Sequence, residues 1–155
     1  MQSWYSKVTN NPDNLEYLAE ALEFFYKELS DGTEEIKPKG KMWDMAVRLP
    51  WIAQHRTSQL MEIEAIRDFF ERKAMKAKID KKRHYLEHYQ RNLTERAAGE
   101  WAEADDEVLT LKEIVEQITL LRNKYAALTK GYEYLHFQMG HLVKLKQSGI
   151  EDAMF

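Results

Sequence analysis

The chain contains no cysteine, only three prolines and six glycines, and no long apolar run. Without cysteine there are no disulfides, thiolate metal sites or cysteine nucleophiles, which is typical of a reducing compartment. The first thirty residues lack the basic start and apolar core of a signal peptide. No stretch approaches the ~18 consecutive apolar residues of a membrane span. We therefore expect a cytoplasmic protein with no membrane partner.

What the chain does contain is charge, since 32% of its 155 residues are Asp, Glu, Lys or Arg. With so little proline and glycine, this composition is typical of long solvated helices and gives strands little support. The length suits one compact domain. We predict an all-α fold in which an amphipathic helix and loop over residues 1–40 precede a basic central helix and a C-terminal helix over residues 41–155.

Helix-capping and helix-breaking residues predict the boundaries of the first helix. Asn11 and Pro12 form a cap followed by a proline suited to the first turn, and Asp31 with Gly32 supplies a stop. Residues 33–41 are polar and interrupted by proline and glycine, which predicts a loop.

The second helix is predicted to begin at Leu49 and Pro50 and to run without a break to Gly99. Its apolar stripe shifts face midway and continues through Ile79, Leu86 and Leu93. The third helix is predicted to begin at a capping box of Thr110 and Glu113.

An apolar heptad follows that capping box, with steps alternating between three and four residues. Its positions are Leu111, Ile114, Ile118, Leu121, Tyr125, Leu128, Tyr132, Leu135, Met139 and Leu142. The repeat predicts a seam about 45 Å long that packs with left-handed supercoiling. We interpret it as an oligomerisation seam. The alternative is an intramolecular hairpin with the second helix, because a heptad does not specify whose helix it meets.

A basic segment lies between Glu71 and Arg91, with a net charge of +5. Lys and Arg neutralise phosphates, and the flat rings of tyrosines stack on unpaired bases. The segment therefore predicts a site for single-stranded nucleic acid, with the candidate residues Arg72, Lys73, Lys76, Lys78, Lys81, Lys82, Arg83, Tyr85 and Tyr89.

An acidic segment follows directly, because residues 95–116 carry eight acids and two basic residues, a net charge of −6. The two segments have the charges needed to pair with each other. The alternative for the basic segment is therefore a solvated helix whose lysines balance a neighbouring acidic stretch.

Catalytic and metal motifs have little support. His84 to His88 match the H-x-x-E-H pattern of inverted zinc proteases, but the surrounding helix is strongly cationic and no third ligand is evident. His136 and His141 are five apart, so they do not share a helical face. No phosphate-binding loop or nucleophile elbow is present. We expect no enzyme activity, no metal and no cofactor.

Four blocks in order resemble the phage UvsY family of recombination mediators. They are LPWIAQHRTSQLMEIEAI (49–66), YLEHYQRNLT (85–94), LRNKY (121–125) and GHLVKLKQSGIEDA (140–153). No single block is diagnostic, and the resemblance rests on the ordered set. It covers about two thirds of the chain and leaves out the first helix.

The resemblance implies a homo-oligomeric ring, such as a heptamer, that binds single-stranded DNA in the host cytoplasm. It also implies contacts with a single-strand-binding protein and with a RecA-like recombinase, which the ring helps to load. A basic Lys-Ala-Arg-Leu-Asp segment of the relatives is tied to DNA binding and is similar to residues 76–80 here, with Lys replacing Arg at Lys78. Lys76 and Lys78 are therefore the first candidates. The other hypothesis is a coiled-coil structural or adaptor protein that binds no nucleic acid.

Overall fold

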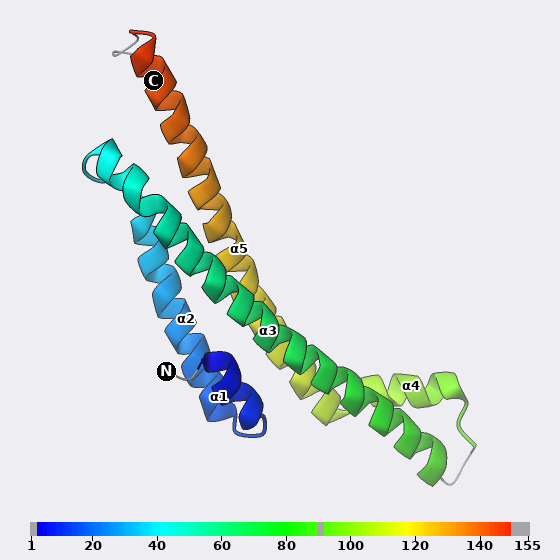
Figure 1. Ribbon diagram of the computed structural model, residues 1–155. Helices are drawn as coiled ribbons and strands as arrows, with labels where there is room; N and C mark the ends of the chain where they lie inside the picture. Colours follow the sequence, from blue (N-terminus) through cyan, green and yellow to red (C-terminus); the bar gives the residue numbers. More distant parts are fainter. Residues whose placement is uncertain (1–2, 90–91, 150–155) are drawn as a thin grey trace.

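The computed structural model describes residues 3–89 and 92–149, and this part of the chain is helical with no β-strand. Figure 1 shows two long helices that run antiparallel and cross, α3 and α5, with α1 and α2 against one side and α4 beside the C-terminal half of α3. The all-α prediction is confirmed. The helices are α1 (Trp4–Asn10), α2 (Leu15–Glu35), α3 (Met42–His88), α4 (Glu95–Glu103) and α5 (Asp106–Gln147).

Two predicted helix starts are wrong by about one turn. The side chain of Asn14, rather than Asn11, caps α2 by accepting a hydrogen bond from the backbone of Glu16. Likewise Asp105 caps α5 by accepting a hydrogen bond from the backbone of Glu107, five residues before the predicted cap at Thr110. Several residues in each stretch were suitable caps, and the packing of the helix selected among them.

Three predicted breaks lie inside helices. Gly32 is buried in α2, which continues to Glu35, and Pro50 lies inside α3, which begins at Met42. The loop is therefore shorter than predicted. Proline removes one helical hydrogen bond, but neighbouring apolar residues of α3 pack against α5 and hold the turn in place. Gly99 lies inside α4, because the long helix ends earlier, at His88.

The core joins residues from both predicted parts of the chain. One cluster brings Val8 of α1 and Phe25 of α2 against Phe70 of α3 and Tyr125 of α5. A second cluster lies farther along α5, around Leu135, and packs against the N-terminal half of α3.

The heptad of α5 supplies the centre of both clusters. Seven of its ten positions are buried within the single chain, namely Ile118, Leu121, Tyr125, Leu128, Tyr132, Leu135 and Met139. Leu111 and Ile114 are partly buried, and Leu142 is exposed. The stripe predicted as an oligomerisation seam therefore packs within the chain, because α2 and α3 present matching apolar faces. Oligomerisation stays a prediction, and a contact between copies would have to use a surface other than the buried heptad positions.

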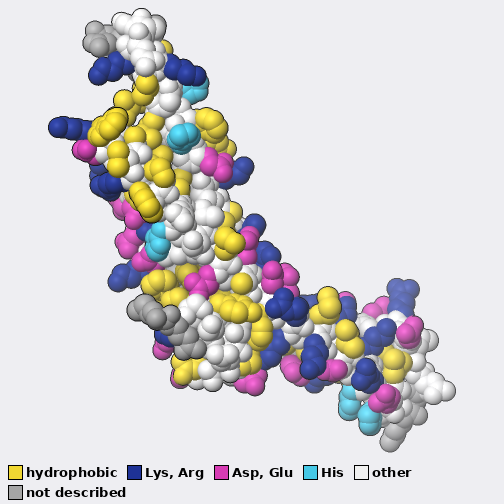
Figure 2. Space-filling model, in the orientation of Figure 1, with side chains coloured by type: hydrophobic (Ala, Val, Ile, Leu, Met, Phe, Trp, Pro, Cys, Tyr) yellow, Lys and Arg dark blue, Asp and Glu magenta, His cyan; other side chains and the backbone are white. Residues whose placement is uncertain are grey.

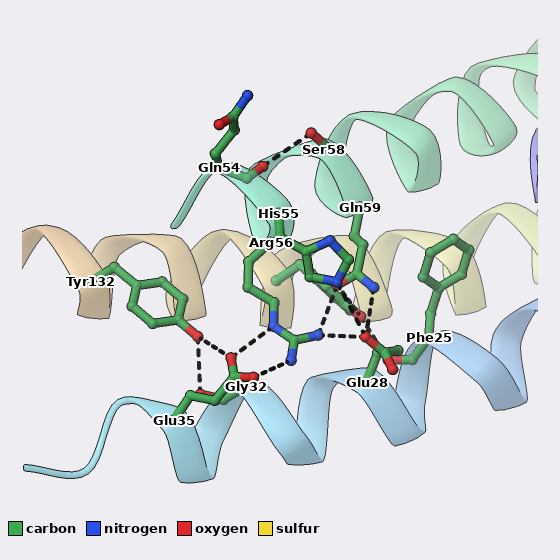
Figure 3. A network of polar contacts seen from close by, with 11 residues as sticks. Phe25, Glu28, Gly32, Glu35, Gln54, His55, Arg56, Ser58, Gln59 and Tyr132 are labelled. Carbon is green, nitrogen blue, oxygen red and sulfur yellow. Dashed lines mark hydrogen bonds and ion pairs between the residues drawn. The ribbon is translucent and has the colours of Figure 1, made fainter. Parts of the chain in front are cut away.

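A buried polar network clamps α2 to α3 and α5 (Figure 3). Arg56 of α3 is only 3% exposed and donates hydrogen bonds to Glu28 at 2.7 Å and to Glu35 at 2.9 and 3.1 Å. It also donates to Gln59 at 2.9 Å, while the hydroxyl of Tyr132 donates to Glu35 at 3.1 Å. Among the described residues, no buried side-chain nitrogen or oxygen lacks a partner.

The network shifts the ionisation of its members. Burial lowers the pKa of Arg56, but the hydrogen bonds and charges of Glu35 and Glu28 outweigh burial and raise it. The hydrogen bond from Gln59, with the charge of Arg56, lowers the pKa of Glu28. Burial and then Glu35 raise the pKa of Tyr132 to about 12. Arg56 therefore stays charged, and its carboxylate partners accept its hydrogen bonds.

Candidate nucleic-acid interface

The predicted basic segment forms the C-terminal half of α3 and presents two different faces. Arg72, Lys76 and Arg83 are spaced by four and seven residues, which places them on one side of a helix. That side points away from the buried stripe that includes Phe70 and Ala74. We call these three cations and the apolar residues between them the outer face.

On the outer face the cations are exposed and interleaved with exposed apolar side chains. Met75 is 65% exposed, Ile79 52% and Leu86 41%. Arg72, Lys76 and Arg83 form no ion pair with any residue of 3–89 or 92–149. Ile79 and Leu86 were predicted to continue the packed stripe, and this is corrected because no helix covers them.

The remaining lysines of the segment are paired with acids. Lys73 contacts Asp13 at 2.7 Å. Lys78 forms an ion pair with Glu103 of α4, and Lys82 lies 3.6 Å from Glu95 at the start of α4. Lys81 lies 3.5 Å from Asp105 and 3.2 Å from Glu107. Four of the predicted DNA-binding lysines are therefore partly neutralised within the chain. Three of them, Lys78, Lys81 and Lys82, pair with the acidic segment, as the alternative interpretation predicted, whereas Lys73 pairs with Asp13.

The pairs shift the pKa values of three groups, Lys81, Glu103 and Asp105. The hydrogen bond with Glu107 raises the pKa of Lys81 despite opposing desolvation. The hydrogen bond and charge of Lys78 lower the pKa of Glu103. Burial opposes ionisation of Asp105, but hydrogen bonds from Glu107 and Tyr85 and the charge of Lys81 together lower its pKa. Lys81, Glu103 and Asp105 are therefore stabilised in their charged forms.

The two predicted stacking tyrosines pack against Trp101 of α4. The rings of Tyr89 and Trp101 meet edge to face with centroids 4.8 Å apart, and those of Tyr85 and Trp101 lie 5.7 Å apart. The hydroxyl of Tyr85 donates to Asp105 at 3.1 Å. Burial and this hydrogen bond raise the pKa of Tyr85. The ring of Tyr85 is partly covered, and Tyr89 keeps 44% exposure.

Figure 2 shows this mixture of charges at the end of the molecule where α4 and the C-terminal half of α3 lie. Dark blue cations and magenta acids alternate there, and no large surface of one sign covers that end in this view. Arg91 and the end of the 140–153 block belong to the predicted features but lie outside the described residues.

The histidines of the zinc-protease pattern stack on each other instead of converging on a point. The rings of His84 and His88 are nearly parallel with centroids 4.8 Å apart. Across residues 3–89 and 92–149, no group of three or more His, Asp or Glu side chains is arranged to hold a metal ion. Within the same residues, no helix is long and apolar enough to cross a membrane.

An apolar groove, absent from the sequence prediction, lies between the N-terminal part of α3 and the C-terminal part of α5. Its volume is about 790 Å³. The lining includes Trp43 and Pro50 of α3 with Phe137 and Val143 of α5. Trp43 is 77% exposed and Phe137 63%. Hydrophobic side chains gather over this end of the molecule in Figure 2. The sequence shows that residue 43 is a tryptophan but not that its side chain is exposed. Periodicity alone also does not reveal that the two helices diverge.

Comparison of the chain with protein-family models, with curated proteins and with solved structures finds no match in any of the three.

Proposed function

We propose that this chain is a recombination mediator that binds single-stranded DNA and assembles into a homo-oligomeric ring. In this role it helps to load a RecA-like recombinase onto strand covered by a single-strand-binding protein. The likeness of residues 49–66 and of the later blocks to UvsY mediators supports the mediator role. The role requires no covalent chemistry.

The observation that carries DNA binding is the outer face of α3. Arg72, Lys76 and Arg83 have no ion-pair partner among the described residues, so they are available to phosphates. Ile79 and Leu86 lie on the same side of α3 and offer apolar surface to unpaired bases. Three cations bind one strand weakly, and repetition of the face around an oligomer would raise the affinity through avidity.

The apolar groove supports self-association. An aromatic side chain carries about 150–250 Å², so Trp43 and Phe137 together expose about 300 Å². This is comparable to the largest apolar patch of a typical monomer, and it can form the centre of an interface that needs about 800 Å² per partner.

The surface next to the groove favours a ring over a symmetric dimer. Val47 and Trp51 are 55% and 74% exposed, and helical periodicity turns them to a different side of α3 from Leu49 and Ala53, which border the groove. We call Val47 and Trp51 the ridge. We infer that the ridge of one copy enters the groove of the next. Such head-to-tail contacts close into a ring where the rotation between successive copies adds up to a full turn, and otherwise form a filament.

A titration of labelled oligo(dT) tests DNA binding. The triple variant Arg72→Ala/Lys76→Ala/Arg83→Ala should lose at least tenfold in affinity at about 50 mM salt. Its slope of log K against log salt should fall by about 2, since each phosphate contact on a single strand contributes about 0.7.

The matched control removes three cations of α5 instead, in Lys124→Ala/Lys130→Ala/Lys144→Ala. It should bind nearly as well as the unaltered chain, because the lost charge lies off the outer face. Equal losses in both triples would mean that only net charge matters, and this would reject the site.

The second candidate function is a structural or adaptor protein. It is favoured by the internal pairing of four lysines and by Asp80 and Glu87, which flank the outer face. An adaptor would show no oligonucleotide binding even at low salt while keeping its oligomeric mass in light scattering.

A further inference from the structure

Helix α4 lies on the one face of α3 that combines lysines with tyrosines. Lys78, Lys82, Tyr85 and Tyr89 are spaced by four, three and four residues and therefore share a side of the helix. We call this side the covered face. It differs from the outer face, which carries Arg72, Lys76 and Arg83.

Charges supply much of the contact between α4 and the covered face. Glu103 pairs with Lys78, and Glu95 lies 3.6 Å from Lys82. These pairs remain open to water, since the side chains of Glu95 and Glu103 are 84% and 51% exposed. Water and salt can therefore compete for each pair.

The apolar part of the contact is small. Only Ala98 and Ala102 of α4 are fully buried, and each offers a single methyl group. Trp101 adds edge-to-face contacts with Tyr85 and Tyr89 but stays 40% exposed. A nine-residue helix with so little buried apolar surface is stabilised mainly by its partner surface.

The chemistry of the covered face matches that of its cover. Lysines form ion pairs with carboxylate or phosphate oxygens, and tyrosine rings pack against either an indole or a base. We propose that α4 is an internal competitor for nucleic acid, whose carboxylates and tryptophan occupy the Lys78–Lys82 and Tyr85–Tyr89 positions that phosphates and bases of a single strand would take.

This inference rests on the proposed function. A strand would first bind the outer face and would gain the covered face only by displacing α4. The acids of α4 then lower the affinity for short or weakly held strands. They do so without altering the outer face, because none of Arg72, Lys76 and Arg83 pairs with α4.

The test compares two variants with equal charge change in the oligo(dT) titration. Glu95→Gln/Glu103→Gln removes the two acids that pair with the covered face. The control Glu113→Gln/Glu116→Gln removes two exposed acids of the same acidic segment that lie on α5. Circular dichroism checks that both remain helical.

We expect the first variant to bind between about twofold and thirtyfold more tightly than the unaltered chain, the range that two exposed ion pairs span. The slope of log K against log salt should also steepen by up to about 1.4, as two further lysines reach phosphates. The control should change by much less. Equal gains in affinity in the two variants would overturn the proposal that α4 competes with nucleic acid, because general charge repulsion would then explain both.

Hydrogen exchange of the unaltered chain gives an independent readout. Saturating oligo(dT) should speed exchange of the amides of residues 95–103 if the strand displaces α4. Slower or unchanged exchange there, with binding intact, overturns the inference while leaving the proposed function standing. Absence of binding in the unaltered chain and in the Glu95/Glu103 variant rejects both.

Discussion

At the scale of single residues, Arg56 matters most to the fold and has no direct part in the candidate interface. Its guanidinium is buried between two carboxylates that α2 supplies. A buried ion pair contributes little net stability against an apolar replacement, but removal of one partner leaves a charge without compensation. Arg56 therefore makes the docking of α2 specific.

Arg56→Met should lower the free energy of unfolding by about 3 kcal/mol, because Glu28 and Glu35 lose their cation. Urea denaturation measures this loss. Arg96→Met is the control, since the side chain of Arg96 is 90% exposed and its ion pair, among the residues that the structure describes, is with Glu100 of its own helix. Adding Glu28→Gln to Arg56→Met should restore part of the loss, and equal stability of Arg56→Met and the unaltered chain would contradict this account.

Stability should also depend on pH through Glu28, whose pKa is lowered from the usual 4.5 by its bonds to Gln59 and Arg56. The unfolded carboxyl takes up its proton near pH 4.5, whereas the folded one does so only at lower pH. The stabilisation is therefore full above about pH 4.5 and is lost as the pH falls through the folded pKa.

Urea denaturation between pH 3 and pH 7 should show this decline. Glu34, Glu103 and Asp105 also have lowered pKa values and contribute to it. Glu28→Gln should flatten the curve only in part. A curve of unchanged slope in that variant would show that Glu28 has no share.

At the scale of elements, two glycines that lie inside helices have different surroundings. A Cβ on Gly32 would lie 2.6 Å from the Leu128 side chain and 3.1 Å from that of Arg56, so α2 approaches α5 and α3 closely there. A Cβ on Gly140 would meet nothing within 4 Å.

Gly32→Ala should therefore destabilise the fold by about 1–3 kcal/mol through overpacking. Gly140→Ala should stabilise it by up to about 1 kcal/mol, since alanine is the better helix former. Thermal or urea unfolding of the two variants provides the comparison. Destabilisation by both changes would mean that Gly140 also has an unrecognised close neighbour.

At the scale of the whole molecule, the proposed contact between ridge and groove predicts which side chains the oligomer needs. Trp51→Ser removes the ridge and Phe137→Ser the groove wall, so each variant alone should fall to the monomer mass in light scattering. Met61→Ser is the control, because Met61 is 65% exposed but does not line the groove.

An equimolar mixture of the two variants sharpens the test. A head-to-tail contact can still form once, between the intact groove of the Trp51→Ser chain and the intact ridge of the Phe137→Ser chain. The mixture should therefore contain dimers but no larger ring. Rings in the mixture, or monomers only, would contradict the ridge-and-groove contact.

Composition together with sequence periodicity determined the all-α class, and periodicity determined the apolar stripe of α5. Both depend on local spacing, since residues three and four apart share a helical face whatever they pack against. The existence of the basic and acidic segments was equally local. Helix ends were less accurate, because Asn14 and Asp105 competed with other caps and tertiary packing chose between them.

Only the tertiary structure decided which partner each face meets. It turned the heptad inward onto α2 and α3, paired Lys78 and Lys82 with acids of α4, and left Arg72, Lys76 and Arg83 exposed. Pairing between separate helices depends on which helices meet and where they cross, and a periodic pattern does not identify the partner. The groove between α3 and α5 has the same origin, because it exists only where the two helices diverge.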